Sequence, residues 1–234
     1  MNTIGILGGM SSAATGEYYK LINEKVKEIR GGYEIAELMI CSVNFGNIEH
    51  FVRTEDWDGA GKYLAEKAKN VENAGASCLF LATNTMHRVR DDIKAAISIP
   101  FIDIFETVSK EIKRQGKSRV GILGTYATMT GDFYVDAYRE FGIEIIAPDE
   151  AQKRKLDRII FDEMTNHIFT ESSKQYFKTA IEELAAKGAE GVILGCTEIK
   201  MLIQQSDVPD IPLFDTTTLH CDLAAQICCG ELVL

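Results

Sequence analysis

Short apolar runs recur along the chain, and each is followed by small or polar residues and then by a segment with helical spacing of its apolar positions. The runs predict strands near 3–7, 37–43, 76–81, 99–104, 119–124, 144–147, 189–194 and 211–214. The helical spacing predicts helices over 13–29, 57–73, 88–97, 105–116, 130–141, 152–166, 171–187 and 220–229. Residues 44–54 and 125–129 read as loops. Alternating strands and helices predict an α/β fold with parallel sheets and right-handed crossovers.

Two of these stretches look like copies of each other. Residues 74–85 and 187–198 each contain Gly-Ala, then an apolar run, then a small polar cluster. Each apolar run is typical of a buried parallel strand, so each cluster falls at a strand's carboxyl end, where open α/β sheets bind ligands. The first cluster offers the hydroxyl of Thr83, and the second offers the thiol of Cys196.

The similarity extends over the chain as an internal repeat. Gly8 and Gly124 are 116 residues apart, and Thr83 and Cys196 are 113 apart. Gly75 and Gly188 are also 113 apart, and Pro100 and Pro212 are 112 apart. We therefore expect two pseudo-symmetric α/β domains, at 1–115 and 116–215, with 216–234 packing back on the first. Chance similarity between Gly-rich turns is the alternative explanation.

Composition narrows the class of protein. The 234 residues are 46% hydrophobic and 26% charged, as in ordinary globular proteins. The net charge of −10 disfavours nucleic acid and anionic membranes as partners. The first residues lack the pattern of a signal peptide, so we expect a cytoplasmic protein with reduced cysteines. The six cysteines and four histidines show no metal-ligand spacing.

The two polar clusters suit proton transfer at a carbon atom. If the domains face each other, Thr83 and Cys196 flank one cleft, where one group removes a proton and the other delivers one. A carbanion next to a carboxylate needs hydrogen-bond donors arranged around its developing charge. The candidates are backbone amides and hydroxyls of Asn84, Thr85, Thr125 and Thr197.

The same residues have ordinary structural explanations. Cys196 fits a buried, small apolar position, and Arg53 fits a solvated loop charge, although its guanidinium also suits a substrate carboxylate. His87 and His220 fit hydrogen-bonded core or cap positions. The glycine-rich turn at 8–9 either binds an anion through its amides or is only a tight strand-to-helix turn; the dinucleotide fingerprint is absent.

Several motifs together resemble the aspartate/glutamate racemase family. They are Gly8-Gly9-Met10, Thr83-Asn84-Thr85, Gly195-Cys196-Thr197-Glu198 and Phe214-Asp215-Thr216-Thr217. The resemblance implies two Rossmann-like domains, cofactor-independent racemisation of aspartate or glutamate, no metal, and a homodimer. It implies catalytic residues at Thr83 and Cys196. It implies substrate-binding residues at Met10, Arg53, Asn84, Thr85, Thr125, Thr197 and Glu198.

The match departs from the family pattern at two places. The family normally has a second thiol where this chain has Thr83, which resembles an L-aspartate/glutamate-specific branch with a Thr/Cys pair. A lysine of aspartate racemases has no counterpart, since Met164 and Thr165 stand nearest. A hydroxyl is a much weaker acid than a thiol, so we expect Cys196 to be the main base and the L-enantiomer to be the favoured substrate. The alternatives are a single-thiol decarboxylase, an isomerase or hydantoin racemase, and a catalytically weak amino-acid-binding protein.

Overall fold

The computed structural model describes residues 1–232, and the chain forms two compact units. The first contains residues 1–104 with the described part of 217–234, and the second contains residues 105–216. The first division lies after Ile104, the first residue of helix α5 (Ile104–Arg114), whereas it was expected at residue 115. The reason is that Phe105, at the start of α5, packs edge-on against Phe133, Tyr134 and Tyr138 of the second unit.

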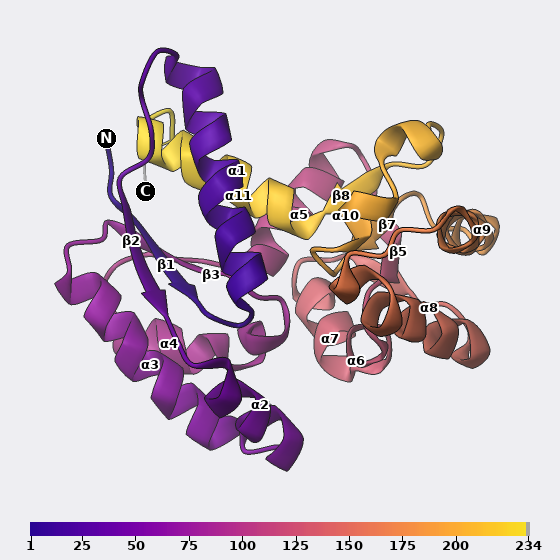
Figure 1. Ribbon diagram of the computed structural model, residues 1–234, viewed down its shortest axis with the longest axis horizontal. Helices are drawn as coiled ribbons and strands as arrows, with labels where there is room; N and C mark the ends of the chain where they lie inside the picture. The colour runs from indigo at the N-terminus through magenta and orange to yellow at the C-terminus, as the bar shows by residue number, and fades with distance from the viewer. Residues whose placement is uncertain (233–234) are drawn as a thin grey trace. The chain divides into compact units, whose positions relative to one another are not determined.

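The first unit is built on a four-stranded parallel sheet with the strand order β2-β1-β3-β4. Its strands are β1 (Ile4–Gly8), β2 (Leu38–Ser42), β3 (Cys78–Leu81) and β4 (Phe101–Ile102). The apolar side chains of β1 and β3 are buried because helices cover both faces of this sheet (Figure 1). The expected strand over 99–104 is shorter here, with two residues in the ladder.

The helices of the first unit form two layers around the sheet. They are α1 (Ser12–Arg30), α2 (Phe45–Thr54), α3 (Trp57–Asn73), η1 (Thr85–Val89), α4 (Arg90–Ala96) and α11 (Thr216–Cys229). Helices α1 and α11 pack on one face through residues such as Tyr18, Ile22 and Cys221, and α3 packs on the other. Residues 44–54 were expected to form a loop, and this was wrong: Asn44 caps a helix by accepting a hydrogen bond from the Gly46 amide at 3.1 Å.

The second unit repeats this plan with the strand order β6-β5-β7-β8, again all parallel. Its strands are β5 (Arg119–Leu123), β6 (Glu144–Ile146), β7 (Val192–Leu194) and β8 (Leu213–Asp215). Besides α5, its helices are α6 (Tyr126–Thr130), α7 (Asp132–Glu140), α8 (Glu150–Asp162), η2 (Met164–Asn166), α9 (Glu171–Ala186), α10 (Ile199–Leu202) and η3 (Gln205–Asp207). The expected loop at 125–129 is wrong, because Thr125 caps the short helix α6.

Matching backbone details show that the repeat is structural. Gly75 and Gly188, which precede β3 and β7, both have a φ of +94°, a value that favours glycine. Gly8 and Gly124, at the ends of β1 and β5, each lie under a threonine side chain that would collide with a Cβ atom: Thr15 over Gly8 and Thr128 over Gly124. The prediction of two related α/β halves, each with a parallel sheet flanked by helices, is confirmed.

Candidate active site

In the first unit, the polar cluster lies in a tight turn at the end of β3. The Thr83 amide donates to the Leu81 carbonyl at 2.9 Å, and the 3-10 helix η1 begins two residues later, at Thr85. Thr83, Asn84 and Thr85 are half-buried, as expected for side chains at the carboxyl edge of a sheet. The Thr83 carbonyl oxygen lies 2.6 Å from Nδ1 of His87. The turn therefore holds both backbone polar groups of Thr83.

The other two predicted binding residues of this unit have their own structural roles. Met10 is buried in the apolar cluster beneath α3, which accounts for its side chain by packing. Arg53 lies in the last turn of α2, where its Nε is 3.3 Å from Oε1 of Glu49 and its side chain is 68% exposed. The Gly9 amide donates to Oγ1 of Thr15 at 2.8 Å, so this amide caps the local turn instead of facing an anion.

In the second unit, two donors converge on one carboxylate oxygen after β7. The thiol of Cys196 donates to Oε2 of Glu198 at 3.0 Å, and the hydroxyl of Thr197 donates to the same oxygen at 2.6 Å. The Gly195 amide is held by the Leu123 carbonyl at 2.8 Å, which fixes the strand end against β5. The side chains of Cys196, Thr197 and Glu198 are half-buried. The motif Cys-Thr-Glu thus forms one hydrogen-bonded group.

The environment of Cys196 keeps its thiol protonated. Burial, and after it the charge and hydrogen bond of Glu198, raise the pKa of the Cys196 thiol well above its ordinary value. The carboxylate of Glu198, in contact with this thiol, is an acceptor for its proton.

Thr125 lies close to the same strand end. Its hydroxyl caps α6, with 3.4 Å to the Thr128 amide and 3.1 Å to the Thr128 hydroxyl. The Thr128 methyl group in turn lies 3.0 Å from where a Cβ on Gly195 would stand. The structure therefore brings Thr125 into the neighbourhood of the Cys196 turn, and it gives the Thr125 hydroxyl a capping role there.

Neither residue near the position of the family's lysine can replace it. Met164 is buried in the core of the second unit, and the Thr165 hydroxyl donates to the Phe161 carbonyl at 2.6 Å. Cationic groups occur elsewhere in this unit, around a cavity of about 370 Å³ that adjoins α6. The cavity is lined by Tyr126, Arg154, Asp157 and Arg158.

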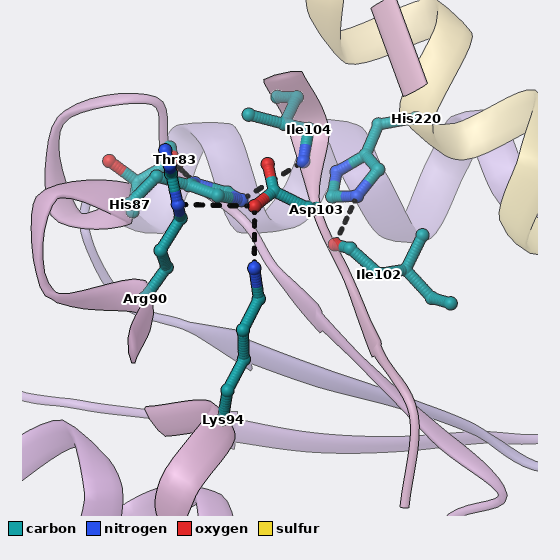
Figure 2. A network of polar contacts seen from close by, with 8 residues as sticks. All are labelled: Thr83, His87, Arg90, Lys94, Ile102, Asp103, Ile104 and His220. Carbon is teal, nitrogen blue, oxygen red and sulfur yellow. Dashed lines mark hydrogen bonds and ion pairs between the residues drawn. The ribbon is translucent and has the colours of Figure 1, made fainter. Parts of the chain in front are cut away.

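The two buried histidines of the first unit are hydrogen-bonded on both ring nitrogens. Figure 2 shows these histidines with their partners Thr83, Ile104 and Ile102. His87 contacts the Thr83 carbonyl through Nδ1, and its Nε2 accepts from the Ile104 amide at 3.2 Å. His220 contacts the Ile102 carbonyl through Nε2 at 2.9 Å, and its Nδ1 lies 2.8 Å from the Tyr18 hydroxyl. Burial lowers the pKa of His87 to about 4 and that of His220 to about 3, so both rings are neutral at pH 7.

An aspartate that sequence reasoning missed lies beside His87. Asp103 is buried, with its Oδ2 3.0 Å from Nζ of Lys94 and 3.4 Å from Nε of Arg90. Burial opposes its ionisation, but the hydrogen bond from Lys94 and the charges of Lys94 and Arg90 hold the pKa of Asp103 below its ordinary value. The repeat carried a signal for this residue, because Asp215 stands 112 residues later, at the end of the equivalent strand β8.

The other cysteines pack against apolar clusters. Cys78, Cys221, Cys228 and Cys229 are buried together in one of them and are not disulfide-bonded. Among residues 1–232, no group of three or more His, Cys, Asp or Glu side chains could hold a metal ion. No helix in that range has the length and apolar character needed to span a membrane.

Comparison with known proteins gives one consistent family. Residues 7–224 match the Asp/Glu/hydantoin racemase family. The chain is 27% identical to the broad specificity amino-acid racemase RacX of Bacillus subtilis (strain 168) over 215 residues, covering 89% of this chain and 91% of that protein. It also resembles the crystal structure of a protein proposed as an Asp/Glu racemase from Yersinia pestis, with 38% identity, a TM-score of 0.93, and 98% and 100% coverage of the two chains. An aspartate racemase homologue from Pyrococcus horikoshii OT3 matches with 36% identity, a TM-score of 0.89, and 98% and 100% coverage.

Proposed function

Because this chain is an amino-acid racemase that belongs to the Asp/Glu/hydantoin racemase family, we propose that it racemises aspartate or glutamate at the α-carbon without a cofactor. Cys196 acts as the main base, and Thr83 acts as the opposing acid. The observation that carries this proposal is the Cys196–Glu198 hydrogen bond at the end of β7, which gives the thiol a ready acceptor for its proton. The hydroxyl of Thr83 stands at the equivalent end of β3.

The proton path follows from these contacts. The Cys196 thiol gives its proton to Glu198, and the resulting thiolate removes the α-proton, which re-forms the S–H bond. The substrate carbanion then takes a proton from the Thr83 hydroxyl on the opposite face. The Thr83 oxygen, left as an alkoxide, regains a proton from water, and Glu198 loses its proton to water, so the site returns to its starting state.

The substrate contacts are proposed from the same turns. Donors at Asn84, Thr85 and Thr197 would hold the substrate's α-carboxylate and the charge that develops beside it. Arg53 would leave its ion pair with Glu49 and bind a carboxylate of the substrate instead. This exchange costs little, because an exposed ion pair within one helix contributes little to stability. Met10, Thr125 and Glu198 complete the predicted lining.

The two reacting groups differ strongly in acidity, which supports a directional enzyme. A thiol that hands its proton to a carboxylate becomes an effective base, whereas a threonine hydroxyl is difficult to ionise near neutral pH. The enantiomer whose α-proton faces Cys196 should therefore have the higher turnover number, with a KM raised in proportion because the two enantiomers are equal in free energy. We take this enantiomer to be the L-form.

Solvent deuterium exchange tests the assignment directly. The parent protein in D₂O should incorporate deuterium at the α-carbon of aspartate or glutamate, and Cys196→Ala should abolish this exchange. Cys41→Ala is the matched control, since Cys41 is another half-buried thiol, placed on β2. Exchange that persists in Cys196→Ala would overturn the site assignment.

The substrate panel separates the rival functions. Neutral amino acids belong in the panel because RacX is described as broad in specificity. Release of carbon dioxide from substituted malonates would favour a decarboxylase. Saturable binding of aspartate without any α-exchange would favour a catalytically weak binding protein.

We also propose a homodimer, which the open edge of the first sheet supports. The Val43 amide and the Glu37 carbonyl are hydrogen-bonded to Gly8 and Ile4 of β1. Backbone groups alternate in direction along a strand, so the amides and carbonyls of Leu38, Ile40 and Ser42 point away from β1, toward the open edge of the sheet. Strand β2 has no charged residue, and Met39 and Ile40 are exposed. The equivalent edge strand β6 has an ion pair between its Glu144 and Arg119 of β5, and charged side chains at an edge disfavour pairing with another chain. An edge strand without charged side chains promotes pairing with another chain. We propose that β2 of one protomer pairs with β2 of its partner across a twofold axis.

Substitution of the edge strand tests this assembly. Ile40→Lys should convert the dimer to a monomer in light scattering after size exclusion. Phe161→Lys, at an exposed apolar position on α8, is the control and should leave the mass unchanged. A parent protein that is monomeric at micromolar concentration would contradict the proposal.

A further inference from the structure

We propose that His87 is a positioning residue for Thr83: it fixes the backbone of the proton-donating residue and so sets where the hydroxyl lies. This inference rests on the proposed function, because it assigns a role to Thr83 in proton transfer. It concerns only groups of the first unit.

The hydrogen bonds of His87 allow one tautomer. The Ile104 amide can only donate, so Nε2 must carry a lone pair toward it at 3.2 Å. The Thr83 carbonyl can only accept, so Nδ1 must carry the hydrogen that it donates at 2.6 Å. A neutral ring with Nδ1–H satisfies both partners. Either the other tautomer or a protonated ring would place an N–H group against the Ile104 amide.

The partner on the far side of His87 is itself fixed. The His220 ring donates to the Ile102 carbonyl at 2.9 Å, and Lys94 and Arg90 bind the carboxylate of Asp103. Residues 102–104 are therefore held by His220 and by Lys94, independently of their contact with His87 (Figure 2). The His87 ring is fully buried and packs edge-on against Phe101. It transmits the position of this segment to the Thr83 turn.

Thr83 depends on its position more than a thiol would. Its amide and its carbonyl are both hydrogen-bonded, which fixes the two backbone dihedrals and hence the direction of Cβ. A weak acid donates a proton effectively only when it is well placed beside the carbanion, and displacement by about 1 Å can cost up to about a hundredfold in rate. The His87 hydrogen bond secures that placement.

The second unit has a related arrangement at the equivalent residues. The offset of 113 that relates Thr83 to Cys196 also relates His87 to Lys200. Nζ of Lys200 lies 3.8 Å from Oδ2 of Asp215. Asp215 is the last residue of β8, and Asp103 directly follows β4, the equivalent strand of the first half. Each half thus places a basic side chain four residues after its reacting group, near the aspartate at the end of the next strand. This shared placement favours a role tied to the reacting residues over simple filling of the core.

Two substitutions separate the two hydrogen bonds of His87. An asparagine amide occupies roughly the place of Nδ1, so His87→Asn keeps a donor for Thr83 and loses the acceptor for Ile104. A glutamine amide reaches the place of Nε2, so His87→Gln keeps the acceptor for Ile104 and loses the donor for Thr83. His220→Gln is the matched control, because His220 is equally buried and does not contact Thr83.

The readout is the ratio of α-deuterium exchange to enantiomer formation, measured with L-substrate in D₂O. When Thr83 is misplaced, the carbanion returns to the face of Cys196, so exchange continues while D-product falls. We expect this ratio to rise about tenfold in His87→Gln, with KM changed less than twofold, to rise by less in His87→Asn, which keeps the donor to Thr83 and loses only the anchor at Ile104, and to stay near the parent value in His220→Gln. Equal loss of exchange and racemisation in the two His87 variants would overturn the proposal.

A measurement on the parent protein covers the case in which the variants do not fold. Long-range ¹H–¹⁵N spectra of the imidazole should show His87 with Nδ1 protonated and Nε2 unprotonated from pH 8 to pH 5. A protonated Nε2 would overturn the assignment. Failure of the proposed function is distinguishable, since it would appear as absent exchange in the parent or as exchange that survives Cys196→Ala.

Discussion

Lowering the pH should destabilise the first unit through its two buried histidines. His87 and His220 titrate near 6.5 in the unfolded chain, whereas burial lowers their pKa values in the folded protein to about 4 and about 3. Between pH 6.5 and pH 4, the unfolded chain binds a proton on each ring that the folded protein does not bind. The free energy of unfolding must therefore decrease as the pH falls through this window.

The size of the effect follows from the unfolded pKa. At pH 5 an unfolded histidine with a pKa of 6.5 is almost fully protonated, which stabilises the unfolded chain by about 2 kcal/mol relative to pH 8. Two such groups give a loss of about 4 kcal/mol, a large part of the roughly 5–15 kcal/mol that stabilises a typical domain. Carboxylates with lowered pKa values, such as Asp103, also lose stability on acidification, but their window lies mostly below pH 5.

Urea unfolding followed by tryptophan fluorescence measures how the free energy of unfolding of the first unit depends on pH. Trp57 is the single tryptophan of the chain, and it lies on α3 in the same unit as both histidines. The parent should lose about 4 kcal/mol between pH 8 and pH 5, and His220→Gln should lose only about 2 kcal/mol over the same range. The comparison uses the change with pH, so the packing cost of the substitution cancels.

The control is His50→Gln, because His50 is exposed on α2. It should leave the change with pH at the parent value. The reasoning is refuted if His220→Gln shows the same loss between pH 8 and pH 5 as the parent. Protons bound by the unfolded chain at that position would then also be bound by the folded protein.

Other predictions address the site itself. Initial rates from pure L- and pure D-substrate should differ, and equal turnover numbers would contradict the unequal acidities of Cys196 and Thr83. Thr83→Cys should raise the relative rate from the D-enantiomer by about tenfold, because a thiol replaces a weaker acid; an unchanged ratio of the two rates would count against Thr83 as the opposing group. Glu198→Gln should lower kcat by about a hundredfold because the Cys196 thiol loses its proton acceptor, and a rate within twofold of the parent would exclude that role. Arg53→Ala should raise KM about tenfold while it changes the free energy of unfolding by less than about 0.5 kcal/mol, and an unchanged KM would leave Arg53 as a surface charge.

The architecture was predictable because its signals are local. Apolar runs beside Gly-Ala pairs located β3 and β7, and the equal spacing of Thr83 and Cys196 indicated two related halves. The prediction of loops at 44–54 and 125–129 was wrong, because these residues form the short helices α2 and α6. Their caps, Asn44 and Thr125, are visible in the sequence but are equally common in turns.

The electrostatics of the site could not be predicted in the same way. The sequence shows that Glu198 stands two residues after Cys196, but the direction of the thiol pKa depends on burial and on the rotamer that brings the two side chains to 3.0 Å. The partners of His87 come from Thr83, four residues before it, and from Ile104, seventeen residues after it. Hydrogen bonds over such separations are set by the packing of β4 against β3.

The hydrogen bond between Cys196 and Glu198 also bears on chemical damage. Thiolates, and not thiols, react rapidly with peroxide and with alkylating agents. A thiol that rests protonated beside a carboxylate is consequently shielded from these reagents, and it becomes a nucleophile only during turnover. Under the proposed mechanism, the same hydrogen bond would let Cys196 serve as a base during turnover while the resting site resists oxidation.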